Sequence, residues 1–359
     1  MRIWSIYTVP FCALVLSLAW ACRSGATRPD QQYFQNAGSD DFDVEILASA
    51  FEQVEAVQDL RSFVVSRDME IVAETYGNDS DPGPDSILHV MSVTKSVTLT
   101  LVGIAVDEGF IDSVHQTVSD FFGEEVDSIN PDLGAVTLHQ LMTMTSGHVW
   151  HEITDPSEFG DWVRADDQIL YIFDKPIVNP PGTVFDYSDG AAHLASAILE
   201  RATGMAATDF ADQYLFGPMG LGERGWYSDN RGISYGGVGL RIGPQDMVEL
   251  GNLYLNGGMS NGVRIVSEEW IEEATSAKVA SGDHIQQYPE YGYYWWLRTD
   301  RGHDCSCAIG YGGQFILVCP DTALVVVATA DYRGRTAQEA GTTWSEIAAA
   351  MDRVLESVR

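Results

Sequence analysis

Ser92 and Lys95 lie three positions apart in the segment Ser-Val-Thr-Lys. A serine hydroxyl is a weak nucleophile, so it needs a neighbouring base to accept its proton. Residues i and i+3 of a helix share one face, and the Lys95 amine can therefore reach the Ser92 oxygen. Apolar neighbours would lower the pKa of that amine by desolvation, which predicts an uncharged lysine acting as base. Alone, the segment also fits an ordinary helix start that carries a lysine.

Three further motifs follow in a fixed order. Residues 141–147 read Leu-Met-Thr-Met-Thr-Ser-Gly, residues 181–189 read Pro-Gly-Thr-Val-Phe-Asp-Tyr-Ser-Asp, and residues 310–314 read Gly-Tyr-Gly-Gly-Gln. With the Ser-Val-Thr-Lys segment, they make the sequence similar to the class C β-lactamase and penicillin-binding protein superfamily, particularly its esterase and 6-aminohexanoate-dimer hydrolase branch. The resemblance covers about residues 43–357.

This resemblance implies a role for each matched position. Ser92 matches the nucleophile, Lys95 the base, and Tyr187 the tyrosine of the Y-x-N motif, which shuttles a proton to the leaving group. The backbone N–H groups of Ser92 and Gln314 would form the oxyanion hole. The expected substrate-binding residues are those of the second and third motifs: Asp189, Tyr311, Gly312, Gly313 and Gln314. No metal or cofactor is implied, and the sequence has neither a paired C-x-x-C nor an H-E-x-x-H motif.

The sequence departs from the family pattern at two places. Asp189 replaces the asparagine of Y-x-N, and it could either cap the following helix or contact the substrate. Tyr311-Gly312-Gly313 stands where many members have K-T-G, so the cation that binds a substrate carboxylate there is missing. The net charge of −32 would also repel anionic substrates at long range. We therefore expect a neutral or cationic ester or amide as the substrate.

Other functions remain open at this stage. The same residues could serve a D-Ala-D-Ala carboxypeptidase, a β-lactamase, or a sensor domain that binds without hydrolysis. Residues 258–262 match G-x-S-x-G, the nucleophile elbow of α/β-hydrolases, but they lack a buried strand before them and a helix after them. They are therefore interpreted as a glycine-rich turn.

The order of the predicted elements indicates an α+β fold in which an antiparallel sheet is flanked by terminal helices and carries an inserted, mainly helical domain. The resemblance implies that this fold is of the β-lactamase/transpeptidase type. The α/β part is expected at about 43–90 and 225–359, and the helical part at about 91–224. Helices are predicted at 43–57, 92–110, 189–203 and 337–358, with another opened by Thr137 and Gln140 and running to Gly147. Strands are predicted at 62–66, 70–74, 291–298, 308–309, 314–318 and 324–328. The aromatic residues at 291 and 293–296 could be strand core or could line an acyl pocket.

The ends and the overall charge indicate where the protein works. Residues 1–21 resemble an export signal, and residues 22–42 resemble a tether. Cys22 follows the small-x-small site, which predicts either a lipid anchor in the membrane or plain secretion. We therefore expect a periplasmic or cell-surface protein. Its acidity excludes nucleic acid as a partner, and scarce lysine with acidic excess suits a salty environment. No oligomeric state is predicted.

Three cysteines cluster near the C-terminus. In an oxidising compartment Cys319 could form a disulfide with either Cys305 or Cys307 across a hairpin. Because three is an odd number, one thiol would stay free.

Overall fold

The computed structural model describes residues 41–77, 83, 86–152, 155, 157–282 and 284–359. The predicted export signal, Cys22 and residues 22–40 of the predicted tether lie outside this range. Phe42 was expected to be the last residue of the tether, but it is fully buried and forms a β-bridge with Val358, so it belongs to the domain. Within the described residues, every helix is too short or too polar to span a bilayer.

An eight-stranded sheet with order β2-β1-β13-β12-β11-β10-β9-β8 forms the centre of the fold, and all its pairings are antiparallel. The middle strands β12 and β13 are buried on both faces, which explains why they read as continuous apolar runs rather than alternating ones. The strands are β1 (Leu60–Arg67), β2 (Glu70–Tyr76), β8 (Val279–Ala280), β9 (Glu290–Tyr291), β10 (Trp296–Asp300), β11 (His303–Gly310), β12 (Gln314–Cys319) and β13 (Leu324–Ala330).

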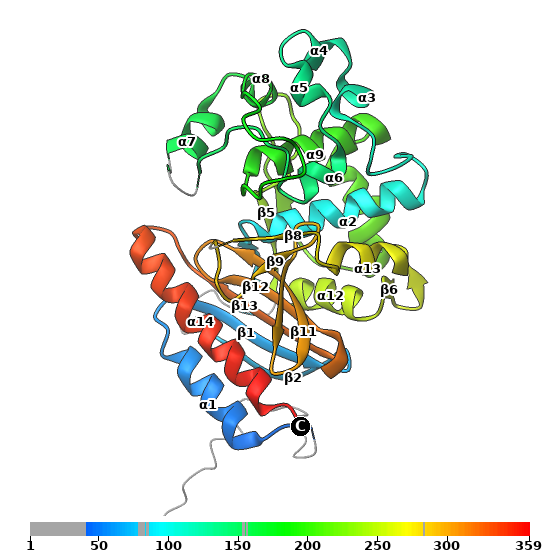
Figure 1. The fold of residues 1–359 in the computed structure, drawn as a ribbon. Coiled ribbons are helices and arrows are strands. Elements are labelled where there is room, and N and C mark those ends of the chain that lie inside the picture. The colour runs from blue at the N-terminus through cyan, green and yellow to red at the C-terminus, as the bar shows by residue number, and fades with distance from the viewer. Residues whose placement is uncertain (1–40, 78–82, 84–85, 153–154, 156, 283) are drawn as a thin grey trace, which may run out of the picture.

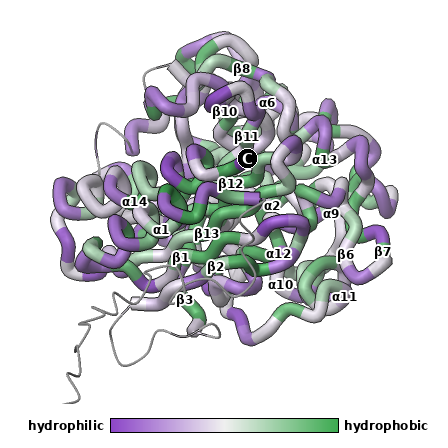
Figure 2. The backbone as a smooth tube through the Cα atoms, turned by 90° about the horizontal axis from the view of Figure 1, so that it is seen from below, coloured by the Kyte–Doolittle hydropathy of each residue, from purple (hydrophilic) through white to green (hydrophobic). Residues whose placement is uncertain are grey.

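Helices cover both faces of this sheet (Figure 1). The terminal helices α1 (Val44–Glu55) and α14 (Ala337–Ser357) pack side by side on one face, and α12 (Pro244–Leu255) covers the other. Each terminal helix begins at a capping residue, Asp43 for α1 and Thr336 for α14. In Figure 2 the most hydrophobic backbone runs through β1, β12 and β13, between these helical layers. The flanking helices therefore bury the apolar faces of the sheet.

The helical part of the chain lies beyond one end of the sheet (Figure 1). Its central helix α2 (Val93–Asp107) is buried on all sides from Val93 to Ala105 and ends three residues before the predicted end at 110. The other helices are α3 (Val118–Phe122), α4 (Glu124–Asp127), α5 (Pro131–Gly134), α6 (Leu138–Met142), α7 (Ser157–Arg164), α8 (Gln168–Phe173), α9 (Asp189–Thr203), α10 (Ala207–Ala211), α11 (Gly217–Met219) and α13 (Glu268–Thr275), with a π-helical turn at Asp212–Phe216.

Several local predictions can be compared directly with the structure. The capping box of Thr137 and Gln140 is present, but α6 ends at Met142 rather than continuing to Gly147. The G-x-S-x-G segment contains the short strand β6 (Met259–Ser260) and the Asn261–Gly262 turn that leads to β7 (Val263–Arg264), so the interpretation as a turn rather than a nucleophile elbow is confirmed. A third small sheet has the order β3-β5-β4, from β3 (Leu88–His89), β5 (Leu240–Ile242) and β4 (Gly225–Trp226).

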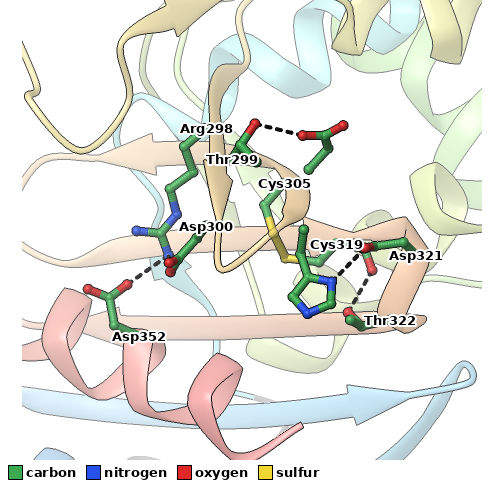
Figure 3. Close-up of a disulfide and its surroundings, with 10 residues drawn as sticks. Arg298, Thr299, Asp300, Cys305, Cys319, Asp321, Thr322 and Asp352 are labelled. Atoms are coloured by element: carbon green, nitrogen blue, oxygen red, sulfur yellow. Dashed lines mark hydrogen bonds and ion pairs between the residues drawn. A yellow bond between two sulfur atoms is a disulfide. The ribbon is translucent and has the colours of Figure 1, made fainter. Parts of the chain in front are cut away.

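The cysteines resolve into one disulfide and one thiol. Cys305 on β11 is bonded to Cys319 at the end of β12, and Cys307 is a buried free thiol (Figure 3). Around the disulfide, Arg298 of β10 donates to Asp352 of α14 at 2.7 Å, and the pair joins the sheet to the terminal helix. The disulfide and this pair therefore hold the end of the sheet that lies away from Gly310.

Candidate active site

The start of α2 presents Ser92 to solvent. Ser92 is the N-cap residue of the helix and is partly exposed, whereas the helix that follows it is buried. Met91, just before it, has a φ of +50°, a left-handed conformation that is strained for a residue with a side chain. Gly310 of β11 packs against this segment so closely that a Cβ on it would lie 2.5 Å from the Val90 carbonyl oxygen. Strand β11 therefore fixes the backbone that carries the serine.

Lys95 lies one helical turn below Ser92 and is almost completely buried. Its Nζ donates to Ser92 Oγ at 3.0 Å, to the Gly237 carbonyl oxygen at 3.1 Å, and to Asp189 Oδ1. An ammonium group has three N–H donors, and these three acceptors use all of them. The predicted pairing of Ser92 with Lys95 is therefore present in the geometry.

The charge state of Lys95 differs from the prediction of an uncharged amine. Burial alone lowers the pKa of Lys95, but interactions led by the charge of the Asp189 carboxylate, which also accepts a hydrogen bond from Lys95, outweigh burial and raise the pKa above its ordinary value. At rest the side chain is an ammonium that donates to Ser92 rather than accepting from it. The sequence did not reveal this because Asp189 is 94 residues away from Lys95 along the chain.

Asp189 is not the cap of α9. Ser188 is the N-cap residue, and its Oγ accepts a hydrogen bond from Ala191 N at 2.9 Å, so the capping interpretation of Asp189 was wrong. The Asp189 side chain is 5% exposed and is bound to Lys95. Gly237 makes the approach possible, because a Cβ there would lie 2.4 Å from Asp189 Oδ1. The carboxylate therefore faces the lysine.

Glu152 is a second buried carboxyl group that no sequence motif indicated. Its Oε2 accepts from Asp189 N at 3.0 Å and from Trp150 Nε1. Burial, followed by the charge of Asp189, raises the pKa of Glu152, while Lys95 opposes the rise. One ammonium and one carboxylate, with Glu152 largely protonated, would keep this buried cluster nearly neutral.

Tyr187 covers the lysine. Its ring centroid lies 4.5 Å from Lys95 Nζ, and its ring stacks on Trp296 with a centroid separation of 5.8 Å. Burial raises the pKa of Tyr187, so the phenol keeps its proton. The predicted strand at 291–298 is interrupted, because Tyr291 ends β9, Trp296 begins β10, and residues 292–295 form the turn between them. The aromatic residues of this run, Tyr291, Tyr293, Tyr294, Trp295 and Trp296, are all buried, so they belong to the core.

The Gly310–Gln314 motif forms the turn between β11 and β12. Gly312 and Gly313 have φ values of +77° and +103°, and a Cβ on Gly312 would lie 2.5 Å from Tyr332 Cβ. Gln314 is fully buried, and its side-chain amide donates to the Ala330 carbonyl at 2.8 Å, so the side chain holds β13. Tyr311 is the residue of this turn with an exposed side chain, 45% accessible.

His148 connects the loop after α6 to the start of α9. Its Nδ1 lies 2.7 Å from Ser146 Oγ and its Nε2 lies 3.1 Å from Ser188 Oγ. Burial lowers the pKa of His148 to about 4, so the imidazole is neutral at pH 7. In the described part of the chain no three His, Cys, Asp or Glu side chains are grouped as metal ligands would be.

The fold and this site together define a class of protein. The β-lactamase and penicillin-binding protein superfamily combines an antiparallel sheet, an inserted helical part, and a serine one helical turn above a buried lysine. The profile of the Beta-lactamase family matches residues 54–350, and the chain belongs to this family. Among curated proteins, it is 28% identical over 284 residues to the 6-aminohexanoate-dimer hydrolase of Paenarthrobacter ureafaciens, covering 74% of this chain and 71% of that one.

A second curated relative, the lovastatin esterase of Penicillium rubens, is 23% identical and is matched over 48% of each chain. Among solved structures, a Bacillus anthracis protein assigned as a 6-aminohexanoate-dimer hydrolase superposes with a TM-score of 0.70 at 21% identity, over 91% of this chain and 86% of that one. The fold is therefore shared, and the curated relatives are hydrolases.

Proposed function

We propose that the protein is a serine hydrolase that cleaves an ester or amide through an acyl-enzyme on Ser92. The observation that carries this proposal is the partly exposed Ser92 hydroxyl 3.0 Å from the Lys95 amine, beneath the neutral phenol of Tyr187. The names of two curated relatives, a 6-aminohexanoate-dimer hydrolase and a lovastatin esterase, support the same reaction class.

The proton must leave Lys95 before the lysine can act as base. Of its three acceptors, the Gly237 carbonyl is too weak a base, and Ser92 is the group to be deprotonated. Asp189 is therefore the acceptor: transfer of one proton from Lys95 to Asp189 leaves a neutral amine, which then takes the Ser92 proton as the Ser92 oxygen attacks the carbonyl carbon.

The tetrahedral oxyanion is stabilised by the backbone N–H groups of Ser92 and Gln314. On its collapse, Tyr187 gives its proton to the leaving alcohol or amine, and Lys95 returns a proton to Tyr187. Asp189 then returns the stored proton to Lys95. Water attacks the acyl-enzyme by the same route, releases the acid and restores the Ser92 hydroxyl.

We also propose that the protein is exported, with Cys22 as the site of a membrane tether. The Cys305–Cys319 disulfide supports an oxidising compartment, because disulfides persist there and are rare in the cytosol.

The proposal can be tested with the mature protein and p-nitrophenyl butyrate. Wild type should release p-nitrophenol and should gain the mass of one alkyl phosphonate at Ser92, whereas Ser92→Ala should do neither. A fluorescent penicillin distinguishes the alternatives, since stable labelling would favour a peptidase or sensor and rapid turnover a β-lactamase. Phosphonate labelling that persists in Ser92→Ala would show that the nucleophile is another residue.

A further inference from the structure

A row of four rings lies beside the nucleophile segment: Tyr227, His89, Tyr332 and Tyr311, with neighbouring centroids 6.1, 6.2 and 5.9 Å apart. His89 is in the middle, three residues before Ser92, so it lies within about 11 Å of Ser92 along the backbone. Tyr227 and Tyr311 form the ends and are 56% and 45% exposed. The row is therefore close to the reacting serine and open to solvent.

The hydrogen bonds of His89 fix its tautomer. The Gly239 N–H donates to Nε2 at 2.9 Å, so Nε2 carries no proton in the neutral ring. Nδ1 therefore carries the proton and donates it to the Tyr332 hydroxyl oxygen, 2.6 Å away. The Tyr332 hydroxyl accepts in this bond, so its own hydrogen is left to donate. Within the described residues it has no acceptor.

Arg241 is a second donor group without an acceptor. It lies opposite His89 in the β3–β5 pairing, and directly paired residues of antiparallel strands project from the same face. The other lysine and arginine side chains of the described residues each meet a carboxylate or a carbonyl, but Arg241 meets neither. In a chain with 52 acidic and 20 basic residues, an unpaired arginine is unexpected.

Both unsatisfied donors flank the same histidine. The charge of Arg241 also disfavours protonation of His89, after burial, and so preserves the tautomer that frees the Tyr332 hydrogen. A ligand that satisfies both donors must be rich in acceptors and negatively charged, and a planar carboxylate matches a guanidinium with two parallel hydrogen bonds.

We propose that Arg241 and the Tyr332 hydroxyl bind a carboxylate of the substrate, at the far end of the acyl group that Ser92 receives. This inference rests on the proposed acyl-enzyme function. It changes the expected substrate. Arg241 of β5 supplies the cation that the Tyr311-Gly312-Gly313 motif lacks. The substrate is therefore an ester or amide whose acyl chain ends in a carboxylate.

The test uses two p-nitrophenyl esters of adipic acid, one with a free terminal carboxylate and the other with that carboxylate as its methyl ester. Arg241→Gln should lower kcat/KM for the free acid about 10- to 100-fold and change that for the methyl ester less than about twofold. Tyr332→Phe should also lower the free-acid value selectively, by a smaller factor. Arg353→Gln, which removes an exposed arginine of α14, is the matched control and should change neither value.

A measurement without turnover separates this inference from the proposed function. Adipate should slow phosphonate labelling of Ser92 in wild type but not in Arg241→Gln, and adipamide should slow it in neither. If labelling occurs and adipate gives the same protection in both proteins, the carboxylate site is wrong although the nucleophile stands. If Ser92 is never labelled, the proposed hydrolase itself fails.

Discussion

Asp189 changes how the lysine beside Ser92 must work. A carboxylate bound to Lys95 stabilises the ammonium, yet it also provides the one strong base that the ammonium contacts. The matched family motif has asparagine at this position, which can accept a hydrogen bond but cannot take the proton. In the proposed mechanism the base is therefore a Lys95–Asp189 pair rather than a lysine alone.

Asp189→Asn tests this pair through the pH profile. Without the carboxylate, the pKa of Lys95 should fall, and the amine must lose its proton to solvent before it can act. We expect kcat at pH 7 to fall about 10- to 100-fold and to recover as the pH rises through the lowered pKa of Lys95. In wild type the rising limb should lie at lower pH, because the Lys95 proton passes to the neighbouring carboxylate rather than to solvent. A rising limb at the same pH in both proteins would mean that Asp189 only positions Lys95.

Glu152 gives a second prediction for single residues. Glu152→Gln keeps an acceptor for Asp189 N–H and Trp150 Nε1 and resembles the protonated acid. We expect it to change the free energy of unfolding by less than about 1 kcal/mol, whereas Glu152→Ala, which leaves two buried donors unbonded, should cost about 2–4 kcal/mol. Urea unfolding monitored by tryptophan fluorescence measures both. Equal losses in the two variants would contradict a protonated Glu152.

The sequence indicated Ser92, Lys95 and Tyr187, which lie together in the structure, because each belongs to a local motif with a chemical reason for its spacing. Glu152, Gly237 and Arg241 carry no such signal, since each contributes through a contact with a residue distant in sequence. Asp189 was found, but its contact with Lys95 was not predicted, for the same reason. Local pattern indicates the candidate reacting atoms, and tertiary packing decides their protonation.

At the scale of elements, the segment between α6 and α9, which includes α7 and α8, determines where Tyr187 lies. His148 joins the two ends of this region through Ser146 and Ser188, and it remains neutral because burial lowers its pKa. The unfolded chain binds a proton at this residue below about pH 6.5, and the folded chain binds one only below about pH 4. The free energy of unfolding therefore decreases as the pH falls through this window.

We predict that the free energy of unfolding of wild type, relative to His148→Gln, falls by up to about 1.4 kcal/mol per pH unit between pH 6.5 and 4. The comparison with the variant removes the contributions of the carboxylates, which titrate in both proteins. Urea unfolding at half-unit pH steps measures this difference. Parallel curves for the two proteins would show that His148 becomes protonated in the folded state as easily as in the unfolded chain.

Prediction of elements succeeded where periodicity and caps agree. The hairpin of β1 and β2 and helices α1, α9 and α14 were all expected from such signals, and α9 ends at Gly204 with a φ of +70°. Helix α6 was expected to be longer because its capping box predicts where it starts but not where it ends. Its end depends on Met144, whose φ of +57° turns the chain toward α9. The short helices α3 to α5 follow from packing rather than from a repeating pattern.

At the scale of the whole molecule, the net charge of −32 destabilises the folded state through repulsion between like charges. Most basic side chains are already paired, so the remaining acidic groups repel one another across the surface. We predict that raising NaCl from 0.05 to 1 M at pH 7 increases Tm by at least about 3 °C, of order 1 kcal/mol for a chain of this size. At pH 5, nearer the pI of about 4.3, the increase should be smaller. Differential scanning calorimetry measures both, and an equal increase at the two pH values would exclude screening as its cause.

The two ends of the domain are joined directly. Arg359 N donates to the Asp41 carbonyl at 3.1 Å, and Phe42 bridges to Val358, so the chain enters and leaves the fold at one point. A linker of a few residues could therefore connect position 359 to position 41, and the exposed Asn261–Gly262 turn could provide new termini. Such a circular permutant would keep every strand neighbour in place while reversing which half of the molecule is synthesised first.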